Sequence, residues 1–132
     1  MKILKILFIT FLCIGLSQNI IAQSTGKGVI KNIEPKELSA TLNNNIQLVD
    51  VRTPNEFKSG HIKGSVNMNY YDQDFSTQIG KLDKSKPIYV YCRSGVRSKY
   101  SSEILKKLGF KKIYNLKGGI LNWNTNKLPL KK

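Results

Sequence analysis

Short apolar runs alternate with amphipathic stretches along most of this chain. Two runs, 46–51 and 87–91, are too uniformly apolar for half-exposed strands and are predicted to be central strands of a sheet. Shorter strands are predicted over residues 28–33, 65–68 and 112–116, with helices between successive strands. Because strands alternate with helices, the pattern predicts a single α/β domain whose central, mostly parallel sheet has helices on both faces.

Two of the predicted helices carry clear local signals. Thr53-Pro54-Asn55-Glu56 is a capping box with proline at the first helical position, so a short helix is expected to begin there and to end by Gly60. A longer helical pattern follows over residues 97–108 and has an apolar face, typical of a helix that packs on a sheet. The side chains on that face are Tyr100, Ile104, Leu105 and Leu108.

The first residues of the chain do not resemble part of a folded domain. Lys2 and Lys5 give a short positive region, and residues 6–16 form an apolar run of 11 residues, too short to span a bilayer comfortably. Polar residues and then Ile20-Ile21-Ala22 follow this run. This order is typical of a secretory signal, so we expect a signal peptide over residues 1–22.

Removal of that signal would leave one domain of 110 residues, 23–132, exported to the periplasm or secreted. The alternative is an uncleaved membrane anchor. A lipoprotein is disfavoured, because Phe11-Leu12 rather than a small residue precedes Cys13. After cleavage we expect a monomer with no stable membrane association.

Basic residues dominate the charge of the chain. The net charge is +14, and loss of Lys2 and Lys5 with the signal lowers it to +12. The lysines are spread along the whole domain, without the basic stripe interleaved with aromatics that binds single strands, so no nucleic-acid partner is expected. A positive field of this kind favours small anionic substrates in a salt-dependent way.

The cysteines narrow the chemistry further. Cys13 would leave with the signal, so Cys92 would be the single thiol of the exported protein and no disulfide could form within the chain. Such a thiol is either buried and inert, paired with another chain, or reactive. Its sequence neighbourhood has to decide between these alternatives.

Cys92 directly follows a predicted central strand and precedes a predicted helix. In a parallel sheet, ligands bind beyond the carboxyl ends of the strands, where this residue lies. Gly95 allows the intervening loop to bend, so that backbone N–H groups and the following helix terminus can form an anion-binding nest. A thiol in that nest is expected to ionise easily, and its thiolate is a nucleophile.

Arginine usage points to the same region. Only three of the 22 basic residues are arginines, and all three lie in this loop or just after the strand 46–51. They are Arg52, Arg93 and Arg97. Arginine offers a planar fork with a permanent charge, which suits an oxyanion or a fixed carboxylate.

Three segments resemble the signatures of rhodanese-type sulfurtransferases. The first is Val90-Tyr91-Cys92-Arg93-Ser94-Gly95-Val96-Arg97-Ser98, which is similar to the active-site loop of that family. The second combines residues 48–57 with Gly60-His61-Ile62 and residues 64–67, and the third is Leu116-Lys117-Gly118-Gly119 with Trp123 and Pro129. The resemblance covers nearly all of residues 29–130, with the three motifs in the family's order.

This resemblance implies a persulfide cycle on Cys92. The thiolate would take the outer sulfur of a donor such as thiosulfate and pass it to cyanide, a thiol or a protein acceptor. Backbone N–H groups of residues 93–97 would stabilise the persulfide, and Arg93 or Arg97 would hold the anionic donor, with Arg97 favoured because it lies at the helix start. No metal or organic cofactor is required. The loop residues that make up this expected binding site are Arg93, Ser94, Gly95, Val96, Arg97 and Ser98.

Loop length bears on the alternatives. Four residues separate Cys92 from Arg97, whereas phosphatases that share the fold have one residue more and a wider nest. Sulfur transfer is therefore favoured over a phosphatase-like or arsenate-reducing enzyme. A non-enzymatic sulfur carrier or thiol-redox binding module remains an alternative.

Other polar residues of the family pattern are expected to be structural. Asp50, Arg52 and Glu56 form a charged group in which Glu56 caps a helix and Arg52 pairs with either acid. His61 is the only histidine and is expected to shape a turn rather than act as the base for Cys92. Gly118-Gly119 is interpreted as a turn.

Overall fold

The computed structural model describes residues 26–132, and the predicted signal peptide lies outside the described residues. Five strands form one sheet: β1 (Val29–Ile33), β2 (Gln47–Asp50), β3 (Val66–Asn67), β4 (Ile88–Tyr91) and β5 (Lys112–Leu116). Their order across the sheet is β1-β5-β4-β2-β3, and every neighbouring pair is parallel. The two most apolar runs of the sequence thus provide interior strands, as predicted.

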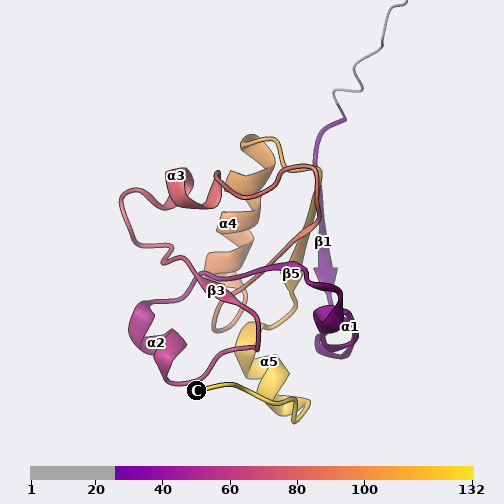
Figure 1. Cartoon of the computed structure of the whole chain (residues 1–132), viewed down its shortest axis with the longest axis vertical. Helices are drawn as coiled ribbons and strands as arrows, with labels where there is room; N and C mark the ends of the chain where they lie inside the picture. Colours follow the sequence, from indigo (N-terminus) through magenta and orange to yellow (C-terminus); the bar gives the residue numbers. More distant parts are fainter. Residues whose placement is uncertain (1–25) are drawn as a thin grey trace, which may run out of the picture.

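Helices cover both faces of this sheet (Figure 1). They are α1 (Pro35–Thr41, followed by a short 3₁₀ turn, Leu42–Asn44), α2 (Pro54–Lys58), α3 (Phe75–Ile79), α4 (Val96–Lys107) and α5 (Gly119–Thr125). Buried side chains of α3 and α4 belong to one hydrophobic cluster, and those of α1 and α5 belong to a second one. The predicted single α/β domain with a parallel sheet between two helical layers is confirmed.

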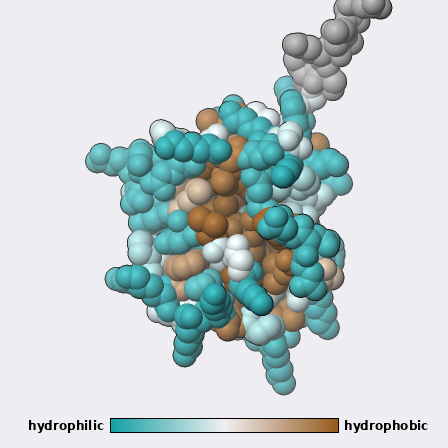
Figure 2. Space-filling view, in the orientation of Figure 1, coloured by the Kyte–Doolittle hydropathy of each residue, from teal (hydrophilic) through white to brown (hydrophobic). Residues whose placement is uncertain are grey.

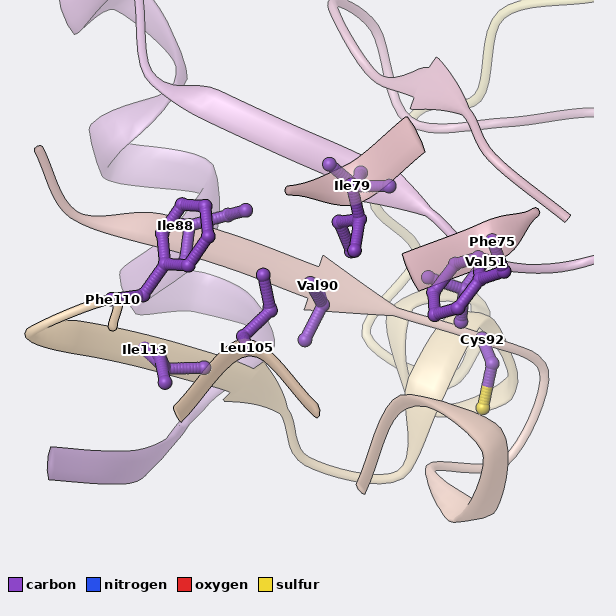
Figure 3. Packing of buried hydrophobic residues seen from close by; sticks show 10 residues of the cluster. Val51, Phe75, Ile79, Ile88, Val90, Cys92, Leu105, Phe110 and Ile113 are labelled. Carbon is purple, nitrogen blue, oxygen red and sulfur yellow. The ribbon is translucent and has the colours of Figure 1, made fainter. Parts of the chain in front are cut away.

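Alternating side chains of β4 supply both clusters. Side chains at alternate positions, those of Ile88, Val90 and Cys92, face the α3–α4 layer. Tyr91 faces the other layer, where its hydroxyl accepts a hydrogen bond from the backbone N–H of Ile62 at 3.1 Å. Figure 3 shows Cys92 at one end of the first cluster, with its sulfur directed away from the other labelled side chains. The strand therefore presents the thiol at its carboxyl end.

The buried face of α4 differs from the predicted one. Tyr100 is 56% exposed, and the fully buried side chains of this helix are those of Ser98, Ser101, Ser102 and Leu105. The prediction that Tyr100 belongs to the packed face was wrong, because small serines allow this helix to lie close against the sheet. Their hydroxyls cost little there, since Ser101 and Ser102 each donate to the carbonyl one turn earlier, at 2.8 Å.

Hydrophilic residues dominate the outline of the face shown in Figure 2, and hydrophobic residues gather at its centre. Among residues 26–132, no helix has the length and apolar character needed to cross a membrane.

Candidate active site

Cys92 lies at the bottom of a tight loop between β4 and α4. The residue is 1% exposed, and Gly95 forms the N-cap of the helix with a φ of 106°, a left-handed conformation that favours glycine. This conformation turns the backbone back over the sulfur. The N–H of Gly95 donates to Cys92 Sγ at 3.1 Å.

A second donor comes from the first turn of α4. The hydroxyl of Ser98 lies 3.4 Å from Cys92 Sγ. Burial raises the pKa of the Cys92 thiol, but the Ser98 hydroxyl and the backbone N–H groups of Ser98, Gly95 and Ser94 outweigh burial and lower it. The site therefore favours the nucleophilic thiolate.

The N-terminus of α5 supports the loop from behind. The N–H groups of Ile120 and Leu121 donate to the carbonyl oxygens of Cys92 and Arg93, at 2.9 and 3.1 Å. A Cβ atom on Gly119 would lie 2.6 Å from Cys92 O and would also overlap Arg93 O. The glycine pair is thus more than the turn inferred from the sequence: Gly119 lets α5 approach the loop.

Arg97 forms a two-pronged ion pair with Glu56. The guanidinium nitrogens lie 2.8 and 2.9 Å from the two carboxylate oxygens, and the ring of Tyr71 lies 5.6 Å from the guanidinium carbon. Arg97 was predicted to hold an anionic donor, and the structure places it at the loop already paired. Glu56 and Tyr71 were not predicted to contact it.

Glu56 serves two partners at once. Its carboxylate accepts from the backbone N–H and the hydroxyl of Thr53, at 3.4 and 3.1 Å, and so completes the predicted capping box of α2. Hydrogen bonds from Arg97 lower the pKa of Glu56 to about 2, and those from Thr53 add to the effect while burial opposes it.

Arg93 and the remaining loop side chains point outward. Arg93, Ser94 and Val96 are exposed, and Val96 is 59% exposed. Arg93 lines a hollow of about 280 Å³ between the loop, α2 and α5, whose other lining residues include Arg52, Glu56, Leu121 and Leu130. Of the two predicted donor-binding arginines, Arg93 is the one that forms no ion pair within residues 26–132.

Asp50 and Arg52 form a buried ion pair. Arg52 donates to the Asp50 carboxylate through Nε at 3.0 Å and Nη2 at 2.6 Å, and Nη2 also donates to Gly60 O at 2.8 Å. The side-chain amide of Asn67 donates to the carbonyl oxygens of both residues. These contacts join β2, β3 and the end of α2, and Arg52 also lines the hollow beside the loop.

His61 contacts α2 and the C-terminal segment. Its Nδ1 lies 2.9 Å from Phe57 O, its ring stacks on Phe57 at 3.7 Å, and its backbone pairs with Lys131. No hydrogen bond joins His61 to Cys92 in the described part of the chain. Between residues 26 and 132, no group of three or more His, Cys, Asp or Glu side chains is arranged to hold a metal ion.

The fold and the site define a class of protein: a parallel α/β domain with one thiol in a backbone cradle beyond its central strand. A family model described as a rhodanese-like domain matches residues 34–126. The chain therefore belongs to the rhodanese-like domain family.

Two relatives and one solved structure show what individual proteins this chain is similar to. The chain is 35% identical over 79 residues to thiosulfate sulfurtransferase GlpE of Shewanella oneidensis, covering 60% of this chain and 76% of that protein. It is 41% identical over 97 residues to tRNA uridine(34) hydroxylase of Pelagibacter ubique, covering 72% of this chain but only 32% of the hydroxylase. The crystal structure of a rhodanese-related protein from Thermoplasma volcanium matches with a TM-score of 0.68 and 27% identity, covering 76% of this chain and 97% of that one.

Proposed function

We propose that this protein is a sulfurtransferase that carries sulfane sulfur on Cys92. The observation that supports this most directly is the set of donors directed at a single buried sulfur atom: the N–H of Gly95 and the hydroxyl of Ser98. These groups stabilise the thiolate before reaction. We expect the same groups to stabilise the negative charge of a persulfide formed on this sulfur.

Two displacement steps complete the cycle. The Cys92 thiolate attacks the outer sulfur of thiosulfate, a Cys92–sulfur bond forms, and the S–S bond of the donor breaks with its electron pair leaving on sulfite. An acceptor thiolate or cyanide then attacks the outer sulfur of the persulfide and releases the Cys92 thiolate. Neither step needs a redox partner or a metal.

Two observations favour sulfur transfer over phosphate or arsenate chemistry. The loop from Cys92 to Arg97 is short, and its donors converge on one sulfur atom rather than on a wider oxyanion. Glu56 occupies both prongs of the Arg97 guanidinium, which a phosphate group would otherwise use. A sulfur carrier without turnover uses the same cradle, so kinetics must distinguish it from an enzyme.

Intact mass measurement tests the proposal. We expect incubation with thiosulfate to add the mass of one sulfur atom, subsequent cyanide to remove it as thiocyanate, and Cys92→Ser to abolish both events. A persulfide that forms but turns over negligibly with small acceptors favours the carrier. Absence of added sulfur contradicts both, and phosphate-ester hydrolysis lost in Cys92→Ser supports the phosphatase alternative.

We also propose that the protein is exported and cleaved after Ala22, since the order of charged, apolar and small residues before that point is typical of a secretory signal. We expect the protein isolated from its native compartment to begin at Gln23. A mass that retains residues 1–22 would instead indicate the uncleaved anchor.

A further inference from the structure

The wall of the site formed by Arg97 carries little net charge. Its guanidinium is held on one side by both oxygens of Glu56, at 2.8 and 2.9 Å, and faces the ring of Tyr71 on another. The two charged side chains are only 16% and 29% exposed, so solvent screens this pair less than a surface pair.

Glu56 is itself held from two directions. Thr53 donates to it through the backbone N–H and the hydroxyl, and the same carboxylate completes the cap of α2. Arg97 therefore cannot take the carboxylate away without weakening that cap, and cannot turn toward a donor without leaving Glu56. The pair is a fixed part of the site.

A donor approaching Cys92 therefore meets an uneven distribution of charge. Arg93 is exposed at the rim and forms no ion pair within residues 26–132, whereas the charge of Arg97 is offset by Glu56. Both Glu56 and Arg93 line the hollow beside the loop. A doubly charged donor gains from one free arginine but also meets the carboxylate of Glu56. A singly charged donor is attracted less strongly by Arg93 and is repelled less strongly by Glu56.

We infer that Glu56 is a specificity-determining residue, which offsets the charge of Arg97 and so disfavours doubly charged sulfur donors relative to singly charged ones. This inference rests on the proposed sulfur transfer. It places Glu56 in a positioning role, since it acts on the donor through Arg97 and through its own charge rather than on the reacting sulfur.

Thiosulfate and methanethiosulfonate make a matched pair of donors. Each transfers its outer sulfur to the Cys92 thiolate by breaking one S–S bond, with sulfite leaving from the first and methanesulfinate from the second. The two donors differ by one unit of charge at the group that departs. The ratio of kcat/KM for thiosulfate to kcat/KM for methanethiosulfonate therefore reports on charge rather than on the intrinsic reactivity of Cys92.

Glu56→Gln removes the charge and keeps an amide that can complete the capping box. The control is Glu34→Gln, which removes another paired carboxylate next to a helix start, that of the exposed Glu34–Lys117 pair. We expect the donor ratio to rise about tenfold in Glu56→Gln and to stay unchanged in Glu34→Gln.

Two results would overturn the inference. One is an unchanged donor ratio in Glu56→Gln, whether both donors react normally or lose activity equally, because a purely structural role for Glu56 affects both donors alike. The other is an equal rise of the donor ratio in Glu34→Gln, which would show that the effect comes from the overall surface charge and not from Glu56. If neither donor places sulfur on Cys92 of the unaltered protein, the proposed function itself fails and the inference fails with it.

Discussion

At the scale of single residues, the reactivity of Cys92 depends on two opposing effects of its surroundings. The residue is almost fully buried, and burial alone would keep the thiol protonated. The hydroxyl of Ser98 and three backbone N–H groups act in the other direction, and the pKa of the thiol falls as a result. Ser98 is the only side chain among these donors, so it is the one that substitution can remove.

Ser98→Ala should raise the pKa of the Cys92 thiol, because it removes a donor to the thiolate while leaving the backbone donors and the burial in place. The midpoint of alkylation rate against pH is therefore expected to move upward. Ser102→Ala is the matched control. Ser102 is also buried in α4, but its hydroxyl donates to Ser98 O rather than to the sulfur.

An unchanged midpoint in Ser98→Ala would show that the backbone donors suffice. An equal shift in Ser102→Ala would show that the effect comes from the packing of α4 and not from the hydrogen bond to sulfur.

The local sequence was enough to identify Cys92 and its loop as the candidate site, because strand, thiol, glycine and helix start are consecutive in the chain. The pairing of Arg97 with Glu56 joins residues 41 positions apart, and no local pattern reports it. The capping box already explained the presence of Glu56, so nothing local indicated that its carboxylate also binds Arg97. The position of Arg97 at the helix start favoured it over Arg93 as the arginine that holds the donor, but its pairing with Glu56 could not be predicted, because that partner is distant in sequence.

At the scale of elements, the contact between α5 and the Cys92 loop depends on the absence of a side chain at Gly119. Its φ is 61°, and an added Cβ would overlap the carbonyl oxygens of Cys92 and Arg93. Those two carbonyls accept hydrogen bonds from the first N–H groups of α5, those of Ile120 and Leu121. The helix and the loop therefore fit together through backbone alone.

Gly119→Ala should destabilise the fold by about 1–3 kcal/mol from overpacking, in addition to the cost of a left-handed alanine. It should also slow loading of sulfur on Cys92, because the loop must shift. Gly64→Ala separates the two effects, since Gly64 has a φ of 85° and nothing lies within 4 Å of its added Cβ. We expect it to cost only about 1–2 kcal/mol.

Urea unfolding and intact mass after exposure to thiosulfate measure the two effects. Equal losses of stability in the two variants would contradict the close approach of α5 to the loop, as would normal sulfur loading in Gly119→Ala.

The Glu56–Arg97 ion pair joins α2 to α4, and it should make the free energy of unfolding depend on pH in the acid range. Hydrogen bonding to Arg97 lowers the pKa of Glu56 from 4.5 to about 2 in the folded protein. A carboxyl group whose pKa is lower in the folded state stabilises the fold fully above its unfolded value. That contribution disappears as the pH falls from about 4.5 through about 2.

Glu56→Gln cannot titrate, so its free energy of unfolding should fall less than that of the unaltered protein over this acid range. Urea unfolding at a series of pH values gives the comparison. Parallel curves for the two proteins would show that the ion pair does not couple the two helices.

Strand and helix order could be predicted from the sequence, because hydrophobic period and capping signals are local. The buried face of α4 could not. Serine is usually exposed and tyrosine often buried, so pattern alone placed Tyr100 inward. Close packing of α4 on the sheet favours small side chains at the contact, so serines are buried there and Tyr100 is exposed. The hydroxyls of Ser101 and Ser102 donate to the carbonyls four residues earlier.

At the scale of the whole molecule, positive charge is widely distributed, and most of the basic side chains in the described part of the chain form no ion pair. Among residues 26–132, Lys86 and Lys117 are the lysines that form ion pairs. Four others line a hollow of about 550 Å³ beside β1 and β5: Lys27, Lys31, Lys111 and Lys112. Charges spread in this way act together over distances comparable with the Debye length, so their effect on an anion near Cys92 should depend on salt.

Alkylation of Cys92 by iodoacetate and by iodoacetamide separates this long-range field from the reactivity of the thiol. Both reagents attack the same thiolate, but only iodoacetate is an anion attracted by a net charge of +14, or +12 without the signal peptide. Raising the ionic strength from about 0.01 M to 0.1 M shortens the Debye length from about 30 Å to about 10 Å. We therefore expect the ratio of the iodoacetate rate to the iodoacetamide rate to fall several-fold over that range, since the distant lysines cease to contribute. A ratio that does not change with salt would mean that anions respond only to the groups lining the loop, and that Arg93 and the Arg97–Glu56 pair alone set the electrostatics of the site.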